Sequence, residues 1–251
     1  MSLLKDKIKE KVDNVEIIQD TQYEEYTEKK LDGKQDVFED GVLVETNFYN
    51  KGEKLPKYYT YYSDGSIKEA YDVEEYYDEE TGVTLKNGSY IVYDENKKVE
   101  KKEQYKNGEL DGECVDKDYG YTTIANYKNG ILNGAYVRYY ENGNKKVEKN
   151  YINGKISGEV KEYYLEGGIQ IVSNYKEDKL EGPYMGYYES GKIKEKNTFK
   201  NNNVDGEMIV YYENGKVKTK GKAVNGQLQG ELNYYYEDGK IKEKRVMKIK
   251  R

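Results

Sequence analysis

The order of apolar and polar residues along the chain predicts short β-strands joined by tight turns. In runs of about six to eight residues, aromatic or aliphatic side chains alternate with lysine, glutamate and asparagine, and Asn-Gly, Asp-Gly or Ser-Gly pairs bound these runs. Such pairs between strands favour hairpin turns because they tolerate a positive φ. No segment keeps an apolar period of about 3.6 residues. The sequence therefore predicts an all-β fold of consecutive antiparallel hairpins.

The turn motifs recur at a nearly constant interval, which is typical of a repeat protein. A Leu/Ile/Val-x-Gly motif ends at positions 112, 134, 158, 182, 206 and 230, which are 22 or 24 residues apart. In the last five of these repeats, another glycine follows a tyrosine pair, and we predict that it forms a structural turn: Gly143, Gly167, Gly191, Gly215 and Gly239. Weaker matches end at positions 41, 65, 96 and 120, so we expect about nine hairpins.

Some repeats depart from this pattern. The Asn-Gly pair at the opposite end of each hairpin becomes Glu177-Asp178 and Asn201-Asn202 in two repeats, which indicates that the position requires a left-handed conformation more than a glycine. Asn96 stands where we expect a turn glycine, after an insertion near residues 74–82. Near Gly120, Asp116-Lys117-Asp118-Tyr119 replaces the tyrosine pair and the repeat is two residues short. We interpret this as a deletion in a turn, and a kink in the sheet is the alternative.

These patterns divide the chain into four segments. We expect a charged N-terminal cap at residues 1–22, with a charged stretch from Lys5 to Lys11, and degenerate repeats at 23–86. Regular repeats of about 24 residues follow at 87–239. The last strand and a lysine-rich C-terminal cap occupy 240–251.

Strand alternation assigns the side chains to two faces of the sheet. Met208, Val210 and Tyr212 share a face that we expect to be buried, whereas Tyr211 lies on the opposite, mixed face. The first tyrosine of each pair thus forms a half-exposed row, which is our candidate partner-binding surface: Tyr139, Tyr163, Tyr187, Tyr211 and Tyr235. The second row packs on the other face: Tyr140, Tyr164, Tyr188, Tyr212 and Tyr236. The sequence leaves open whether these rows are core only or also bind a partner.

Composition limits both the core and the chemistry. With 31 tyrosines and 36% charged residues, the chain lacks the aliphatic residues for a thick core. It has no histidine and a single cysteine, Cys114, so a histidine relay, a histidine-ligated metal and an internal disulfide are excluded. We expect no enzymatic activity, no cofactor and no metal. The 48 acidic and 42 basic residues, of which three are arginine, argue against nucleic acid and anionic membranes.

The motif Tyr-x-Asn-Gly-x-Leu-x-Gly followed by Tyr-Tyr-x-x-Gly, as in Tyr151–Gly158 and Tyr163–Gly167, resembles the MORN repeat (membrane occupation and recognition nexus). The spacing is similar to that of the bacterial MORN variant, and the likeness is specific from Asn87 to Lys248. The resemblance implies an elongated single-sheet solenoid and a scaffold role, including antitoxin-like partners of toxins. Similar repeats are fused to phosphatidylinositol-phosphate kinases, but this sequence carries no kinase motif.

We therefore expect a non-catalytic scaffold that binds another protein, with a toxin as one such partner. Carbohydrate or cell-wall polymer binding through aromatic ladders is one alternative, and binding to phospholipid or a membrane surface, as the repeat name suggests, is another. Open edge strands at both ends allow end-to-end self-association. The chain as written predicts a cytoplasmic location, and an exported or cell-surface location follows if a signal peptide has been removed.

Overall fold

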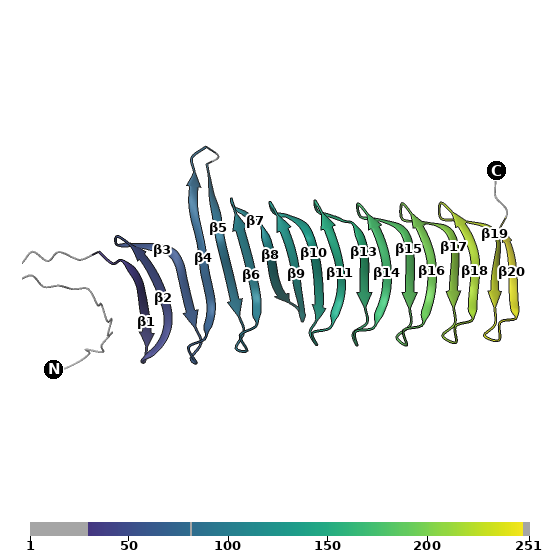
Figure 1. Cartoon of the computed structure of the whole chain (residues 1–251), viewed down its shortest axis with the longest axis horizontal. Helices are drawn as coiled ribbons and strands as arrows, with labels where there is room; N and C mark the ends of the chain where they lie inside the picture. The colour runs from purple at the N-terminus through teal and green to yellow at the C-terminus, as the bar shows by residue number, and fades with distance from the viewer. Residues whose placement is uncertain (1–29, 81, 248–251) are drawn as a thin grey trace, which may run out of the picture. The chain divides into compact units, whose positions relative to one another are not determined.

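The computed structural model describes residues 30–80 and 82–247. The regular secondary structure of these residues consists of β-strands alone (Figure 1). The chain forms two compact units, Met1–Glu109 and Leu110–Arg251. The expected N-terminal cap at 1–22, with its stretch from Lys5 to Lys11, and the last residues of the C-terminal cap lie outside the described residues. The expected all-β fold is confirmed.

The first unit is an antiparallel meander in which each strand pairs with the next. Its strands are β1 (Gly33–Glu39), β2 (Val42–Asn50), β3 (Glu53–Tyr61), β4 (Ile67–Asp78), β5 (Val83–Tyr93) and β6 (Val99–Lys106), and the short β7 (Glu109–Leu110) lies at the boundary. β4 and β5 pair without a register shift from Glu69↔Val92 to Asp78↔Val83. The insertion near residues 74–82 therefore lengthens this one hairpin, which projects beyond its neighbours in Figure 1.

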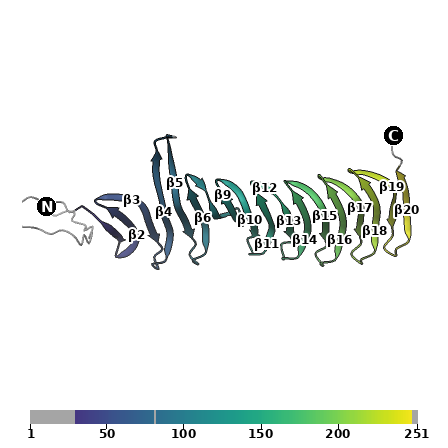
Figure 2. The same ribbon diagram turned by 45° about the horizontal axis from the view of Figure 1, so that its top comes forward.

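The second unit is a longer meander of the same kind. Its strands are β8 (Gly112–Asp118), β9 (Tyr121–Lys128), β10 (Ile131–Tyr140), β11 (Lys145–Ile152), β12 (Lys155–Ile156), β13 (Gly158–Tyr163), β14 (Ile169–Lys176), β15 (Lys179–Tyr187), β16 (Ile193–Lys200), β17 (Asn203–Tyr211), β18 (Val217–Val224), β19 (Gln227–Tyr235) and β20 (Ile241–Met247). Figures 1 and 2 both show these strands side by side in chain order. The expected repeat of antiparallel hairpins in an open sheet is confirmed.

One end of the hairpins carries two-residue turns in which both residues have positive φ. Asn225 and Gly226 have φ of 49° and 78° between β18 and β19. Glu177 and Asp178 adopt 49° and 66° at the equivalent place. This geometry is that of a type I′ turn, whose twist matches the twist of the paired strands. The prediction that this position requires a conformation more than a glycine is confirmed.

The opposite end carries the longer turns that follow the tyrosine pairs. All five predicted turn glycines have positive φ, at 86°, 94°, 78°, 84° and 91°: Gly143, Gly167, Gly191, Gly215 and Gly239. In each turn the glycine N–H donates to the carbonyl oxygen of the second tyrosine at 2.9 Å. In the first unit the same bond joins Lys97 N–H, at a φ of 64°, to Asp94. The assignment of Asn96 to the glycine position was therefore wrong by one residue, because Asp94 stands in place of the second tyrosine.

The shortened repeat is closed by a two-residue turn at Tyr119 and Gly120, with φ of 45° and 76°. β8 and β9 pair continuously from Gly112↔Tyr127 to Asp118↔Tyr121, without the register shift that other hairpins show beside the tyrosine pair. The interpretation as a deletion in a turn is thus confirmed for this hairpin.

The two faces of the second unit differ less than expected. Val160 and Leu232, 4% and 6% exposed, lie in the same row as Met208, on the face predicted to be buried. Val172, however, is 9% exposed and lies opposite Lys161 and Met185 on the other face. Met208 and Val210 themselves are only half-buried, as is Tyr212, which follows the end of β17 and lies in the turn. The prediction of one buried face was therefore wrong in part, because an open single sheet leaves solvent on both sides.

Candidate interaction surface

The second tyrosine of each pair joins neighbouring hairpins by a hydrogen bond. Tyr188 Oη donates to the backbone oxygen of Tyr211 at 2.6 Å, and Tyr212 Oη donates to that of Tyr235 at 2.7 Å. The same bond starts from Tyr140, Tyr164 and, in the first unit, Tyr62. Lys194 and Lys218 lie over the rings of Tyr188 and Tyr212, 6.0 and 5.5 Å from the ring centroids. These hydrogen bonds therefore link neighbouring repeats. We call them the bracket hydrogen bonds, and the tyrosines that donate them the bracket tyrosines.

At the other end of the hairpins, the Leu/Ile/Val-x-Gly motif holds the turn of the following repeat. The N–H of Gly226 donates to the backbone oxygen of Val204 at 2.9 Å, and the N–H of Asn225 donates to Asp205 Oδ2 at 3.1 Å. Equivalent pairs of bonds hold the turns at residues 107–108, 129–130, 153–154 and 201–202. Hairpins that carry both features are thus tied to their neighbours at both ends, beyond the strand ladder itself.

The five candidate partner-binding tyrosines occupy equivalent positions in consecutive hairpins. Four are the last residues of β13, β15, β17 and β19, and Tyr139 is the second-last residue of β10. All five are half-buried, and a register shift of the strand pairing precedes each one. Because one strand lies between neighbouring members, two inter-strand spacings separate them, and the expected distance along the row is about 9–10 Å.

The hydroxyl groups along this row differ in their partners. Tyr163 Oη donates to Glu148 Oε1 at 2.5 Å, and Tyr187 Oη lies 3.7 Å from Met185 Sδ, a weak contact. The hydroxyl groups of the other three, Tyr139, Tyr211 and Tyr235, make no hydrogen bond to any of residues 30–80 and 82–247. Three of the five phenol groups therefore remain able to donate to or accept from a partner.

Charged residues beside the row are neutralised locally. Hydrogen bonds from Lys145 and Tyr163 hold the pKa of Glu148 below its usual range, and burial together with the bond to Glu148 raises the pKa of Tyr163. Lys220 pairs with Glu207 at 2.9 Å, which raises the pKa of that lysine. Exposed pairs of this kind add little stability. They give the surface around the tyrosines a balanced charge.

Six segments of the chain match the family described as the MORN repeat variant: residues 86–107, 132–153, 156–177, 180–201, 204–223 and 228–248. Together they cover more than half of the sequence. The chain belongs to the MORN repeat family. No curated protein matches it. The matched MORN segments leave out residues 108–131, which contain the shortened hairpin, and the repeats before residue 86.

The bonds between MORN repeats were not found from the sequence, although it carries a signal for them. The residue between the aliphatic residue and the glycine always has a side chain that can accept a hydrogen bond: Asp111, Asn133, Ser157, Glu181, Asp205 and Gln229. A position restricted in this way indicates a repeated hydrogen bond. The bracket tyrosines gave no comparable signal, because tyrosine also occurs at half-buried strand positions.

The described part of the chain has no helix with the length and apolar character of a membrane span. Within the same residues, no group of three or more acidic or cysteine side chains is placed to hold a metal ion. Cys114 is buried in β8.

Proposed function

We propose that this MORN-repeat chain is a non-catalytic scaffold that binds another protein through the tyrosine row of Tyr139, Tyr163, Tyr187, Tyr211 and Tyr235. The observation that carries the proposal is the row itself, which is half-buried, recurs in five consecutive hairpins and has three phenol groups without a described partner. Tyrosine is enriched at protein interfaces because it offers a large contact area and a hydrogen-bonding group with few rotatable bonds.

The bonds between repeats support binding by a rigid surface. The backbone oxygens of Tyr211 and Tyr235, two members of the row, each accept a bracket hydrogen bond from the preceding repeat. The ends of the strands that carry the row are thereby held before a partner arrives. A surface ordered in advance loses less conformational entropy on binding.

The charge distribution favours a protein over nucleic acid or an anionic membrane. Lysines beside the row are paired with glutamates, as in Lys161–Glu159 at 2.6 Å and Lys244–Glu231 at 3.8 Å. A phosphate backbone or an anionic lipid surface calls for an excess of cations, which this region lacks. An antitoxin-like role is a narrower form of the same proposal, in which the partner is a toxin.

The proposal is tested by affinity purification from the native cells with matched variants. Tyr211→Thr with Tyr235→Thr removes two rings of the row and keeps residues that favour strands. Tyr77→Thr with Tyr236→Thr is the control, because these rings are 65% and 51% exposed but lie outside the row. Circular dichroism melting verifies that both variants are folded.

We expect a specific protein to be retained by the wild type and by the control, and to be lost from the row variant. Co-expression with the genes beside that of this chain tests whether this protein is a toxin. A partner that the row variant retains as strongly as the wild type would contradict the proposal, as would the absence of any specific partner.

A further inference from the structure

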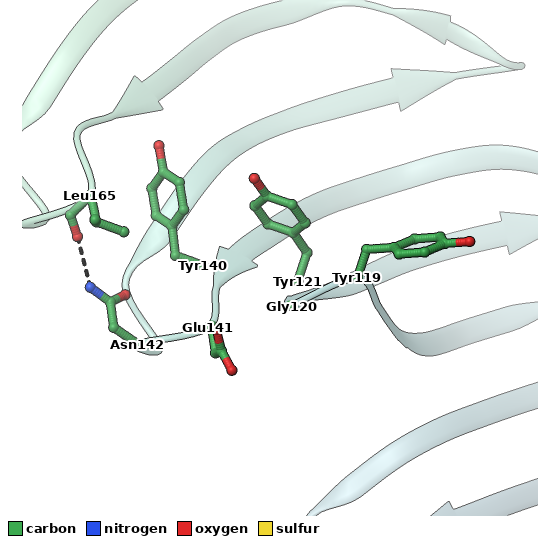
Figure 3. A pocket seen from close by; sticks show the side chains of 7 residues that line it. All are labelled: Tyr119, Gly120, Tyr121, Tyr140, Glu141, Asn142 and Leu165. Carbon is green, nitrogen blue, oxygen red and sulfur yellow. Dashed lines mark hydrogen bonds between the residues drawn. The ribbon is translucent and has the colours of Figure 1, made fainter.

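The turn of the shortened hairpin β8–β9 borders a hollow in the second unit. Its volume is about 490 Å³, and its lining includes Tyr119, Tyr121, Tyr140, Glu141, Asn142 and Leu165 (Figure 3). The rings of Tyr121 and Tyr140 stand side by side, with Tyr119 beyond them and Glu141 and Asn142 on the adjoining turn. The hollow has the size of a small-ligand site.

The residues that line this hollow depart from the chain's own repeat. Tyr121 begins β9, the second strand of its hairpin. Among the described residues of the second unit, no other hairpin begins its second strand with an aromatic residue: the equivalent residues are Lys145, Ile169, Ile193, Val217 and Ile241. Leu165 follows a tyrosine pair and is 53% exposed, whereas the other pairs of this unit are followed by glutamate. Tyr119 lies in the shortened turn and is 92% exposed. Three departures that each add an apolar or aromatic surface therefore meet at one place.

The cations near the hollow are engaged by Tyr121. The guanidinium carbon of Arg138 lies 4.3 Å and Lys146 Nζ lies 4.0 Å from the centroid of the Tyr121 ring. The proximity of Lys146 lowers the pKa of the Tyr121 hydroxyl. Neither cation is part of the lining. Lys146 Nζ also lies 5.6 Å from the centroid of the Tyr140 ring. These contacts engage both cations behind the two rings, and no cationic side chain lines the hollow.

The polar groups of the lining are a carboxylate and an amide on one turn. The Glu141 carboxylate makes no hydrogen bond or ion pair with another residue in the described part of the chain. Asn142 Nδ2 donates to the backbone oxygen of Leu165 at 2.9 Å, and Asn142 Oδ1 accepts from the Asn144 N–H at 3.0 Å. The amide is thus held in place and keeps one N–H to donate, while the carboxylate can accept from two donors.

We propose that this hollow binds an uncharged sugar unit of a carbohydrate chain. The exposed ring of Tyr119 offers a flat apolar surface against which the C–H face of a sugar ring packs. Glu141 accepts hydrogen bonds from neighbouring sugar hydroxyls, and Asn142 donates to a hydroxyl or ring oxygen. Leu165 closes the apolar side. No member of the tyrosine row proposed to bind a protein lines this hollow.

The lining disfavours other ligand classes. An anionic ligand would meet the Glu141 carboxylate without a cation on the lining to offset the repulsion. An extended peptide needs free backbone groups to add as a strand. Here the backbone N–H of Tyr140 donates to the backbone oxygen of Asn144, and the backbone N–H of Gly143 donates to that of Tyr140. Tyr140 also pairs with Tyr121 in the strand ladder, so these backbone groups are already engaged. The polar groups left for a ligand are the Glu141 carboxylate and the Asn142 amide, and an uncharged ligand that presents hydroxyl groups fits them.

The test begins with an array of short, linear, uncharged oligosaccharides of glucose, mannose and N-acetylglucosamine, followed by calorimetric titration of the best binder. Tyr119→Asn removes the ring and leaves an Asn-Gly pair, the preferred sequence for this turn, so the variant keeps its fold. Glu141→Gln removes the charge at nearly constant size. Glu189→Gln, the same change at the equivalent position two repeats later, is the matched control.

We expect Tyr119→Asn and Glu141→Gln each to weaken binding by at least about tenfold, and Glu189→Gln to leave it unchanged. The Tyr211→Thr, Tyr235→Thr variant should bind the oligosaccharide like the wild type. No binding on the array would overturn the proposal, and so would binding that survives Tyr119→Asn. Loss of binding in the row variant alone would also overturn it, since the sugar would then lie on the tyrosine row.

Discussion

Removing one bracket hydroxyl tests how far the hydrogen bonds between repeats stabilise the sheet. Tyr188→Phe keeps the ring, and with it the contact to Lys194, but deletes the bond to the backbone oxygen of Tyr211 at 2.6 Å. Burial raises the pKa of Tyr188, with a smaller contribution from Glu213, which agrees with a partly desolvated hydroxyl. A hydrogen bond of this type contributes about 0.5–1.5 kcal/mol net. We therefore expect Tyr188→Phe to lower the free energy of unfolding by about 1 kcal/mol.

Tyr236 supplies the matched control. It is the second tyrosine of the last pair, it is 51% exposed, and its hydroxyl makes no hydrogen bond to any residue between 30 and 247 that the structure describes. Lys242 lies over its ring as Lys194 does over that of Tyr188. Tyr236→Phe should therefore change the free energy of unfolding by less than about 0.5 kcal/mol.

Thermal unfolding measures the difference between the two variants. For a chain of this size, 1 kcal/mol corresponds to a change in Tm of about 2–4 °C. Tyr164→Phe combined with Tyr212→Phe should give close to the sum of the single effects, because distant sites are additive. Equal Tm values for Tyr188→Phe and Tyr236→Phe would refute the role of the hydroxyl as a bracket.

Four further substitutions, at three positions, test the turns and the charged cluster. Gly215→Val should lower the free energy of unfolding by about 1–3 kcal/mol, and Gly215→Asn should lower it by less. Gly215 has a φ of 84° and free space where a Cβ would lie, so a difference in Tm between the two variants reports backbone strain alone. Asp205→Ala should cost about 0.5–1.5 kcal/mol in urea unfolding, since it removes the acceptor for the turn N–H of the next repeat. Hydrogen bonds from Lys145 and Tyr163 lower the pKa of Glu148 from 4.5, so its contribution is present at neutral pH and is lost as the pH falls through the lowered value. Glu148→Gln should therefore unfold less steeply with acid than the wild type, and an unchanged acid profile would show that the pair is not formed.

The sequence predicted the parts of the fold that depend on local conformation. Residues such as Glu177 and Asp178 replace Asn-Gly only where both residues need positive φ, and the observed angles agree. The error at Asn96 came from the same reasoning. The glycine position of this turn is counted from the second tyrosine of the pair, and here Asp94 stands in place of that tyrosine. Local patterns identify the turn but not always its first residue.

Contacts between repeats were harder to predict, because they join residues that are about one period apart. Alternation placed Tyr212 with Met208 on a packed face, whereas the strand ends at Tyr211 and Tyr212 turns to bond the next repeat. The sequence marks the hollow at Tyr119 by a short repeat that carries a tyrosine in its turn. The lining also includes Leu165, which comes from a later turn. Which residues lie next to a shortened turn depends on the three-dimensional spacing of hairpins.

The binding role of the tyrosine row is tested most directly by photo-crosslinking in the native cells. A benzoyl-phenylalanine introduced at Tyr211 places the reactive group on the row, at a hydroxyl without a described partner, and the same group at Tyr236 is the control. We expect a discrete protein adduct with the residue at 211 and none with the residue at 236. An absence of adducts at 211, or the same adduct from both positions, would contradict the proposed binding surface.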